Sequence, residues 1–261
     1  MGSSAPFRIE EIIIPGEIKP PKEPLVDEIP IPLPQPYQNN SFRMMIVGPS
    51  GSGKSNLFIN LLINAYDQVF NHVWVYCPTF ENDATLRKLT QVSSVSHEAY
   101  LEPSDVFMDA DPKAISENIT ERLAQIDGEF AVYRKDYPKK PLPKTLMVFD
   151  DLTNEIKNAT FMKNLFTKGR KHEISLIIIT NKYKEYSPQI RNNCSHFAFF
   201  KPTTAMEEDA IITDIAGTSD PASLKKTMDK LFAKPNRPFL YYNSRAEKNK
   251  YWFKSETPLN A

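Results

Sequence analysis

Short apolar runs alternate with segments of helical spacing along most of this chain. The runs are rich in Val, Ile, Phe and Met, as strands buried on both faces of a sheet are. They lie at about 43–47, 73–76, 146–149, 174–180 and 197–200, with short late strands at 239–242 and 251–253. Helical spacing is found at about 54–66, 82–91, 112–137, 158–171, 204–216 and 221–233. Strands that alternate with helices predict an α/β fold, a mostly parallel sheet with helices on both faces.

The two ends of the chain differ from this alternating part. Nine of the 22 prolines lie in residues 1–36, and segments so rich in proline can form neither a helix nor a central strand. This stretch is interpreted as an arm that packs along the domain or a neighbour, with a disordered tail as the alternative. The predicted divisions are a proline-rich extended arm at 1–40, a core at 41–203 with a helical insertion at about 98–137, and a basic C-terminal subdomain or extension at 204–261.

Residues 48–55 carry the complete phosphate-binding pattern G-x-x-x-x-G-K-[ST] between a predicted strand and a predicted helix. That context favours a nucleotide site over a flexible Gly/Ser turn. Backbone N–H groups of such a loop surround a phosphate, and the positive end of the following helix faces the same anion. Lys54 is expected to reach the β- and γ-phosphates, and Ser55 to bind Mg²⁺. The predicted nucleotide-binding residues are Gly48, Pro49, Ser50, Gly51, Ser52, Gly53, Lys54, Ser55 and Asn56.

A pair of acids follows the apolar run at 146–149, where the chain reads Asp150 and Asp151. Ligands bind at the carboxyl ends of strands in open α/β sheets. Asp150 is therefore expected to bind Mg²⁺, directly or through water, as the Walker B acid. Asp151 is expected to orient or deprotonate the attacking water. The alternative is a pair that starts a turn or caps a helix, but the loop upstream favours catalysis.

The next predicted strand ends in Thr180 and Asn181. In P-loop NTPases of the additional-strand (ASCE) type, this strand carries a polar sensor of the γ-phosphate, and an amide can both donate to phosphate and position water. We therefore predict an ASCE fold with Asn181 as the sensor, and a strand-end cap is the alternative. The same stretch resembles the guanine-reading motif N-K-x-D, but Lys184 stands in place of the aspartate. ATP is expected instead of GTP.

Composition and charge add only a little to the prediction of function and partners. The formal net charge is zero, with 32 basic and 32 acidic residues, so no global field draws the chain to nucleic acid or to a membrane. Residues 221–261 nevertheless hold nine bases and three acids, which indicates either an anionic partner or a solvated basic surface. Two cysteines in apolar surroundings indicate a reducing compartment. The longest aliphatic stretch, 176–179, is far too short to cross a bilayer, so no membrane partner is expected.

Together these features resemble the genome-packaging ATPases of large DNA viruses (the poxvirus type among them), virophages and related transposons, which belong to the FtsK–HerA superfamily. The resemblance covers roughly residues 40–200. It is carried by the segments 48–55, 148–152, 169–175 and 186–193, of which the last two are the more particular. Two positions depart from the family pattern. Asn181 stands where the family usually has Gln, and Asp151 where many superfamily members have Glu.

The resemblance implies an ATP-hydrolysing motor that translocates double-stranded DNA into a preformed capsid. It implies a homo-oligomeric ring of roughly five or six subunits, with capsid or portal-vertex proteins as partners. It also implies a place in the host-cell cytoplasm, in the virus factory, with association with the virion as a further option. ATP and Mg²⁺ would lie between subunits, and an arginine of the neighbour, Arg170 or Arg191, would stabilise charge on the γ-phosphate. The alternative for either arginine is a surface ion pair or a helix C-terminal cation.

DNA contacts of such a motor are expected at phosphates, because packaging cannot depend on genome sequence. The candidates are Lys182, Lys184, Lys225, Lys226, Lys230, Arg245, Lys248, Lys250 and Lys254, with Tyr251 and Trp252 beside them.

Three other functions stay open from the sequence. A P-loop small-molecule kinase needs an arginine-rich lid, whereas residues 98–129 hold nine acids and two bases. The second is a non-packaging DNA-associated P-loop ATPase, helicase-like or of the partition type. The third is an interaction module that nucleotide merely holds together.

Overall fold

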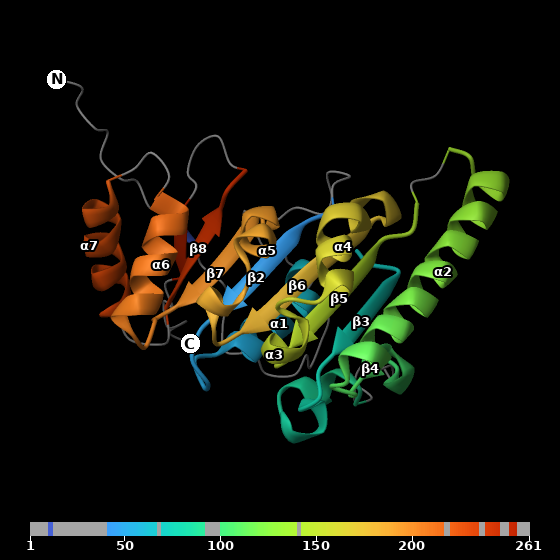
Figure 1. Cartoon of the computed structure of the whole chain (residues 1–261), viewed down its shortest axis with the longest axis horizontal. Coiled ribbons are helices and arrows are strands. Elements are labelled where there is room, and N and C mark those ends of the chain that lie inside the picture. The colour runs from blue at the N-terminus through green and yellow to red at the C-terminus, as the bar shows by residue number, and fades with distance from the viewer. Residues whose placement is uncertain are drawn as a thin grey trace, which may run out of the picture.

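The computed structural model describes residues 10–12, 41–66, 69–91, 100–139, 142–216, 220–234, 238–245 and 251–254. Apart from residues 10–12, the arm predicted at 1–40 therefore lies outside the described residues. Figure 1 shows the chain as one broad sheet with helices packed against it.

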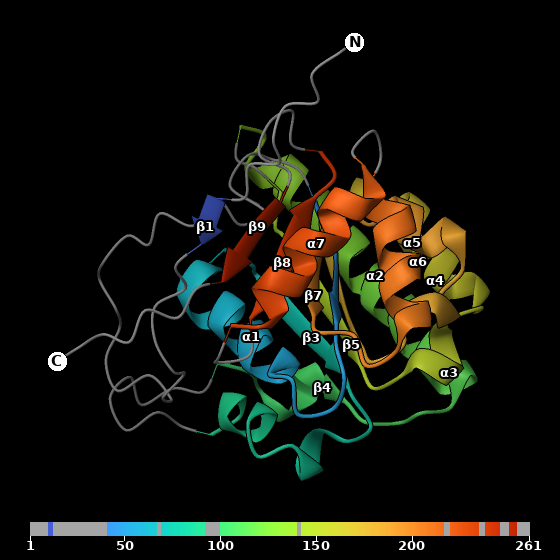
Figure 2. The same cartoon turned by 90° about the vertical axis from the view of Figure 1, so that its left-hand side faces the viewer.

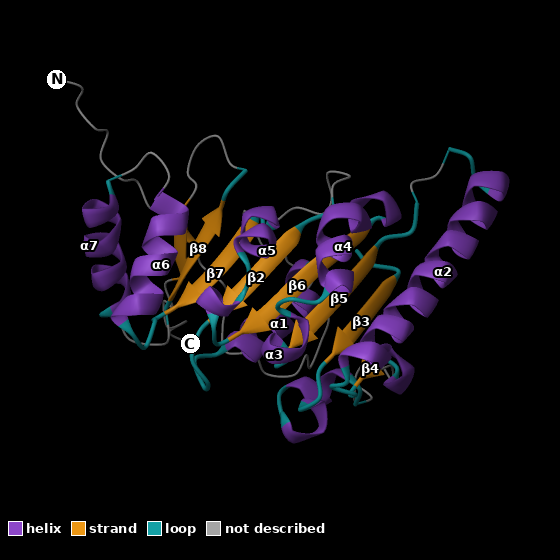
Figure 3. Cartoon of the chain, viewed as in Figure 1, coloured by secondary structure: helices purple, strands orange, loops and turns teal. Residues whose placement is uncertain are grey.

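In the described residues, nine strands form a single sheet in the order β1-β9-β8-β7-β2-β6-β5-β3-β4. Figure 3 shows its strands from β8 to β4 in orange. The run from β7 to β4 is parallel, whereas β8 and β9 continue the sheet in antiparallel pairs. The strands are β1 Glu10–Ile12, β2 Arg43–Val47, β3 His72–Tyr76, β4 Val106–Phe107, β5 Thr145–Asp150, β6 Ile174–Thr180, β7 His196–Phe200, β8 Phe239–Asn243 and β9 Tyr251–Lys254.

Helices connect the parallel strands. The α-helices are α1 Lys54–Asn60, α2 Pro112–Asp136, α3 Thr153–Ile156, α4 Thr160–Lys168, α5 Pro188–Asn193, α6 Ala205–Ala216 and α7 Pro221–Phe232. A π-helical segment, Leu61–Ala65, continues α1. Short 3₁₀ turns lie at Phe80–Asn82, Leu86–Leu89, Pro103–Asp105, Gly169–His172 and Tyr183–Glu185.

Alternate residues of the strands supply two separate cores, because successive side chains of a strand point to opposite faces. In β2, Met45 and Val47 join the core under α2 to α7, whereas Met44 and Ile46 join the core under α1. Figure 2 shows this layering, with α1 on one side of the sheet and α2, α4, α5 and α6 on the other. The α/β fold with helices on both faces, predicted from the apolar runs, is confirmed.

The order of the central strands fits the additional-strand type. Strand β6 lies between β2, which leads into the glycine-rich loop, and β5, which ends in the acid pair. Their registers align the carboxyl ends, since Val47 pairs with Thr180 and Asp150 pairs with Ile179. The loop, the acids and the end of β6 therefore meet at one edge of the sheet, although they come from distant parts of the chain.

The helix predicted over 82–91 is wrong. This stretch instead forms the two 3₁₀ turns Phe80–Asn82 and Leu86–Leu89, separated by residues 83–85. The Asp83 carboxylate accepts hydrogen bonds from backbone N–H groups just after it, and such side-chain bonds compete with helix formation. Leu86 and Leu89 are both buried, and their spacing of three residues suits a 3₁₀ turn as well as an α-helix.

The regions predicted at 98–137 and 204–261 are built into the same sheet. In the described part of 98–137, α2 is the one long helix. The short strand β4, which precedes it, pairs with β3 and extends the sheet at its edge. In the second, α6 and α7 pack on one face, and β8 pairs antiparallel with β7. The C-terminal region is thus an extension of the core sheet. Strand β1 pairs with β9 at the far edge.

Candidate active site

The loop between β2 and α1 has the backbone shape that a phosphate-binding loop needs. Gly51 and Gly53 have φ angles of 72° and 105°, in the region that glycine adopts at little cost. Gly48 is closely enclosed, because a Cβ atom there would lie 2.6 Å from Cβ of Phe200. The Gly48 amide donates to the Thr180 carbonyl at 3.1 Å, which ties the start of the loop to the end of β6.

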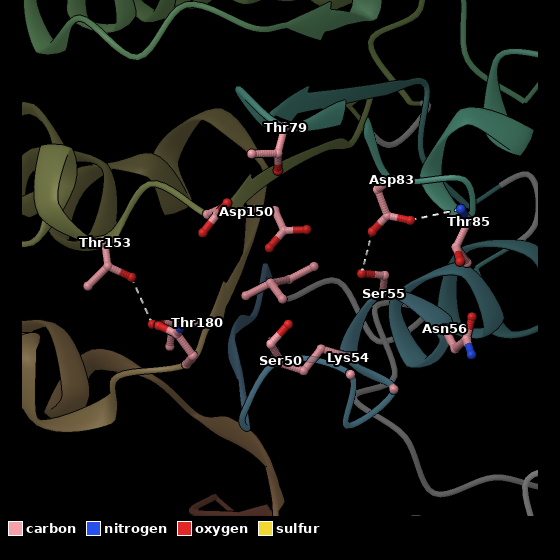
Figure 4. Close-up of a pocket in the computed structure, with 15 residues that line it drawn as sticks. Ser50, Lys54, Ser55, Asn56, Thr79, Asp83, Thr85, Asp150, Thr153 and Thr180 are labelled. Carbon is pink, nitrogen blue, oxygen red and sulfur yellow. Dashed lines mark hydrogen bonds between the residues drawn. The ribbon is translucent and has the colours of Figure 1, made fainter. Parts of the chain in front are cut away.

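A cavity of about 350 Å³ opens beside this loop, and Figure 4 shows the side chains that face it. Four segments contribute to its wall: the loop with the start of α1, the residues after β3, the end of β5 with the start of α3, and the end of β6. The lining residues are Ser50, Gly51, Gly53, Lys54, Ser55, Asn56, Thr79, Asp83, Thr85, Asp150, Asp151, Thr153, Ile179, Thr180 and Asn181.

Most of the predicted site residues therefore gather around one cavity. The loop residues that line it run from Ser50 to Asn56 with Ser52 excepted, whereas Gly48, Pro49 and Ser52 support the loop without lining the cavity. Both acids and Asn181 lie on the wall. Arg170 and Arg191 do not. The structure thus brings the loop, the acid pair and the end of the sensor strand together around one cavity.

Lys54 and Asp150 influence each other's charge across the cavity. Lys54 Nζ donates to the Pro49 carbonyl at 2.9 Å. Burial lowers the pKa of Lys54, while Asp150 and Asp151 act in the opposite direction. The pKa of Asp150 is raised to about 7, chiefly by burial; the nearby charges of Asp151 and Asp83 also raise it, whereas Lys54 lowers it. A cation next to Asp150 would therefore favour its carboxylate form.

Asp151 has an unusual backbone. Its φ angle is 56°, in the left-handed region, which aspartate adopts more readily than most residues. The residue is exposed and lines the cavity directly after the end of β5. Strained residues of this kind persist where the surrounding structure holds them, and they gather at functional sites.

Among the acidic residues that line the cavity, Asp83 is the one that the sequence analysis missed. Ser55 Oγ donates to Asp83 Oδ2 at 2.9 Å, and Figure 4 shows Asp83 between Ser55 and Thr85. It was overlooked because 82–91 was interpreted as a helix. Its position in the sequence could have indicated it, because Asp83 follows the predicted strand β3, and ligands of open α/β folds bind where strands end.

The end of β6 is held by hydroxyl groups. The hydroxyls of Thr180 and Thr153 are hydrogen-bonded at 2.8 Å, and Thr180 Oγ1 accepts from the Lys182 amide at 3.0 Å. These bonds join the strand that precedes Asn181 to the helix that follows the acid pair. Asn181 itself is exposed at the cavity wall, where a γ-phosphate sensor has to lie.

The two predicted arginines lie in different settings. Arg191 is bonded within its own chain, with Nε donating to Asp214 at 2.8 Å and Nη1 donating to the Tyr186 carbonyl at 2.7 Å. Arg170 is exposed, in the 3₁₀ turn that precedes β6, and so lies at the edge of the sheet opposite the cavity. Arg170 is therefore the freer of the two to reach a neighbouring molecule.

Gly169, next to Arg170, has a structural role of its own. A Cβ at this position would lie 3.3 Å from Nη2 of Arg43, whose buried guanidinium donates to the carbonyls of Leu165 and Ile174. The glycine thus leaves room for an arginine that joins the end of α4 to the start of β6.

Two of the predicted DNA-contacting lysines form ion pairs instead of standing free. Lys182 Nζ bonds to Glu185 at 2.8 Å, and Lys225 pairs with Glu208. Lys226 and Lys230 are exposed on α7. Lys248, Lys250 and the side chains of β9 lie outside the described residues.

The cavity has the donors for a magnesium ion bound together with nucleotide. In the described part of the chain, no group of three or more His, Cys, Asp or Glu side chains could hold a metal. Mg²⁺ instead takes one or two carboxylates plus phosphate oxygens and water. The Ser55 hydroxyl and the Asp150 carboxylate, both on the cavity wall, fit this pattern. None of the described helices is long and apolar enough to span a bilayer.

Comparison with known proteins identifies the family. The profile of the poxvirus A32 protein family matches residues 35–231, which is most of the chain. The chain belongs to the poxvirus A32 protein family. Among curated members of similar sequence, the DNA packaging protein OPG160 of monkeypox virus is 21% identical over 170 residues, which cover 65% of this chain and 51% of that protein. The vaccinia virus (strain Copenhagen) OPG160 is also 21% identical, with 57% of its length covered.

This A32-family chain spans about half the length of the curated relatives it matches. Solved structures share its fold. B204, the DNA-packaging ATPase from Sulfolobus turreted icosahedral virus, has a TM-score of 0.56 at 15% identity, covering 84% of this chain and 99% of B204. The genome packaging NTPase B204 from Sulfolobus turreted icosahedral virus 2, in complex with ATP-gammaS, gives 0.53 at 14% identity, covering 84% and 98%. The fold is that of a P-loop NTPase.

Proposed function

We propose that this A32-family chain is an ATP-hydrolysing motor that moves double-stranded viral DNA into a preformed capsid. The observation that carries the proposal is the single cavity that brings Lys54, Ser55 and the Asp150–Asp151 pair together at one edge of the sheet. Family membership supports the DNA-packaging part of the proposal, because curated relatives of similar sequence are named DNA packaging proteins.

The predicted site residues on the cavity wall each have a role in this proposal. The loop amides and Lys54 bind the phosphates of ATP, and Asn181 contacts the γ-phosphate. Ser55 and Asp150 hold Mg²⁺, which when bound would offset the charge of the phosphates. Asp151 takes the proton from the attacking water. Its exposed position at the cavity wall leaves room for that water.

The proposal extends to a ring of subunits with ATP near their interfaces. Arg170 would reach the neighbour's cavity, because it is exposed, whereas Arg191 is already bonded to Asp214. DNA phosphates and the capsid or portal vertex would be the partners, in the cytoplasmic virus factory of the host cell.

Hydrolysis assays with two variants test the catalytic part. Lys54→Ala should abolish ATP hydrolysis, because the phosphates lose their cation. Asp151→Asn should keep ATP binding but slow turnover by about 100-fold or more, the usual contribution of a general base. If Asp151→Asn hydrolyses ATP at the wild-type rate, Asp151 is not the base.

The DNA dependence of the same assay separates the motor from the other functions. A packaging motor hydrolyses ATP faster when long duplex DNA is added. A small-molecule kinase transfers phosphate to an acceptor without DNA, and an interaction module does neither. The particle mass with a bound ATP analogue then tests the ring, since a monomer under all conditions would contradict it.

A further inference from the structure

Asp83 is the one carboxylate bonded to the magnesium-binding hydroxyl of the loop in the described part of the chain. Ser55 Oγ donates its proton to Asp83 Oδ2 at 2.9 Å. Neither Asp150 nor Asp151 makes a hydrogen bond of this kind to Ser55 among the bonds found in the described residues. A serine hydroxyl that donates its only proton to a carboxylate keeps its lone pairs free for a cation.

The Asp83 carboxylate is itself held in place. Its second oxygen, Oδ1, accepts from the amides of Thr85 and Leu86 at 2.7 Å and 3.1 Å. The segment that carries it is anchored in the core through Phe80 and Leu86, each 1% exposed. One oxygen therefore faces the backbone and the other faces Ser55, so the side chain cannot rotate without loss of several bonds.

We propose that Asp83 is a positioning residue for magnesium, which acts through Ser55 by accepting its hydrogen bond and so turning the lone pairs of the hydroxyl toward the metal of bound Mg–ATP. The inference rests on the proposed ATP site and deepens it. Partners that orient a metal ligand commonly contribute about 10–100-fold to metal affinity. Asp83, from the segment that follows β3, is thus a third acid at the proposed magnesium site, beside the pair at the end of β5.

Substitution with asparagine tests this role with little change in shape. In Asp83→Asn the amide oxygen can still accept from Thr85 and Leu86, but the NH₂ group then faces Ser55 and donates to it. One lone pair of the Ser55 hydroxyl is then consumed, and its proton loses the carboxylate that kept it turned away from the metal. The affinity for a non-hydrolysable ATP analogue, measured by calorimetry over a range of Mg²⁺ concentrations, should fall by about tenfold with saturating Mg²⁺. With EDTA it should equal or exceed the wild-type value, because one negative charge near the phosphates is gone.

Asp105→Asn is the matched control. Asp105 also accepts a backbone amide in a 3₁₀ turn, from Glu102 at 3.0 Å, but it does not line the cavity. This variant should bind the analogue like the wild type at every Mg²⁺ concentration. A double-mutant comparison with Ser55→Ala adds a second readout, since the two changes should not be additive if Asp83 acts through Ser55.

Three results would overturn the inference: a wild-type Mg²⁺ dependence in Asp83→Asn, an equal loss of affinity with and without Mg²⁺, or additive effects with Ser55→Ala. Failure of the ATP site itself is distinguishable from these. In that case the wild-type protein binds no nucleotide, or binds it without any effect of Mg²⁺.

Discussion

Individual glycines in this chain differ in what surrounds them. Gly48 starts the phosphate-binding loop, and a Cβ there would meet Phe200 at 2.6 Å and Ser52 Oγ at 2.7 Å. Gly128 lies in α2, where an added Cβ meets nothing within 4 Å. The same change to alanine should therefore have opposite effects at the two positions.

Gly48→Ala should weaken nucleotide binding and destabilise the fold by about 1–3 kcal/mol, the usual cost of overpacking, because backbone around the loop has to shift. Gly128→Ala should stabilise the protein by up to about 1 kcal/mol, because alanine favours a helix over glycine. Thermal unfolding and binding of an ATP analogue measure both. Equal stabilities for the two variants would show that the loop tolerates the added methyl group.

At the scale of elements, the contact between β7 and β8 contains a histidine that is sensitive to pH. His196 in β7 is 7% exposed, and its Nδ1 lies 2.7 Å from the hydroxyl of Tyr241 in β8. The pKa of His196 is lowered to about 3, chiefly by burial and in addition by the positive charge of Arg245. The ring is therefore neutral in the folded protein at neutral pH.

Acid should destabilise the fold through this contact. Between pH 6.5 and about 3, the unfolded chain binds a proton at His196 that the folded chain does not, so the free energy of unfolding falls as pH drops through this window. One such group contributes up to about 1.4 kcal/mol per pH unit. Urea unfolding at pH 7.5 and pH 5 should show a smaller fall for His196→Gln than for the wild type. The same fall in both would rule out His196 as the cause.

At the scale of the whole molecule, the exposed Arg170 and the nucleotide cavity lie at opposite edges of the sheet. Arg170 precedes β6 and the cavity lies at the carboxyl end of the same strand. An arginine so placed cannot reach the cavity of its own chain, so in the proposed ring it would serve the cavity of a neighbour.

Mixing two inactive variants tests this arrangement. Lys54→Ala lacks a working loop but supplies Arg170, and Arg170→Ala lacks the arginine but keeps the loop. A mixture should recover part of the ATPase rate, because some intact cavities then face an intact Arg170. Arg191→Ala is the comparison: because Arg191 is bonded to Asp214 of its own chain, this variant should keep its ATPase rate without any mixing. No recovery with Arg170→Ala would exclude a role for Arg170 in the neighbour's cavity.

Much of the fold and the core of the site could be predicted from local patterns. Each apolar run and the glycine-rich loop depend on residues close together in the chain, so their spacing is sufficient to locate them. Short elements such as α3 and α5, with four and six residues, escaped prediction because so few residues carry no reliable period. Asp83 escaped because the 3₁₀ turn at Leu86–Leu89 has the same leucine spacing as a helix.

The sequence alone determined the strand–loop–helix unit, the acid pair at the end of its strand and the α/β class, since hydrophobic period and backbone chemistry act over short distances along the chain. Only the tertiary structure decided which distant residues meet. It put β6 between β2 and β5, joined Ser55 to Asp83 across 28 residues, and bonded Arg191 to Asp214. These pairings depend on the order and register of strands from separate segments, which the burial of the whole sheet sets and no local pattern encodes.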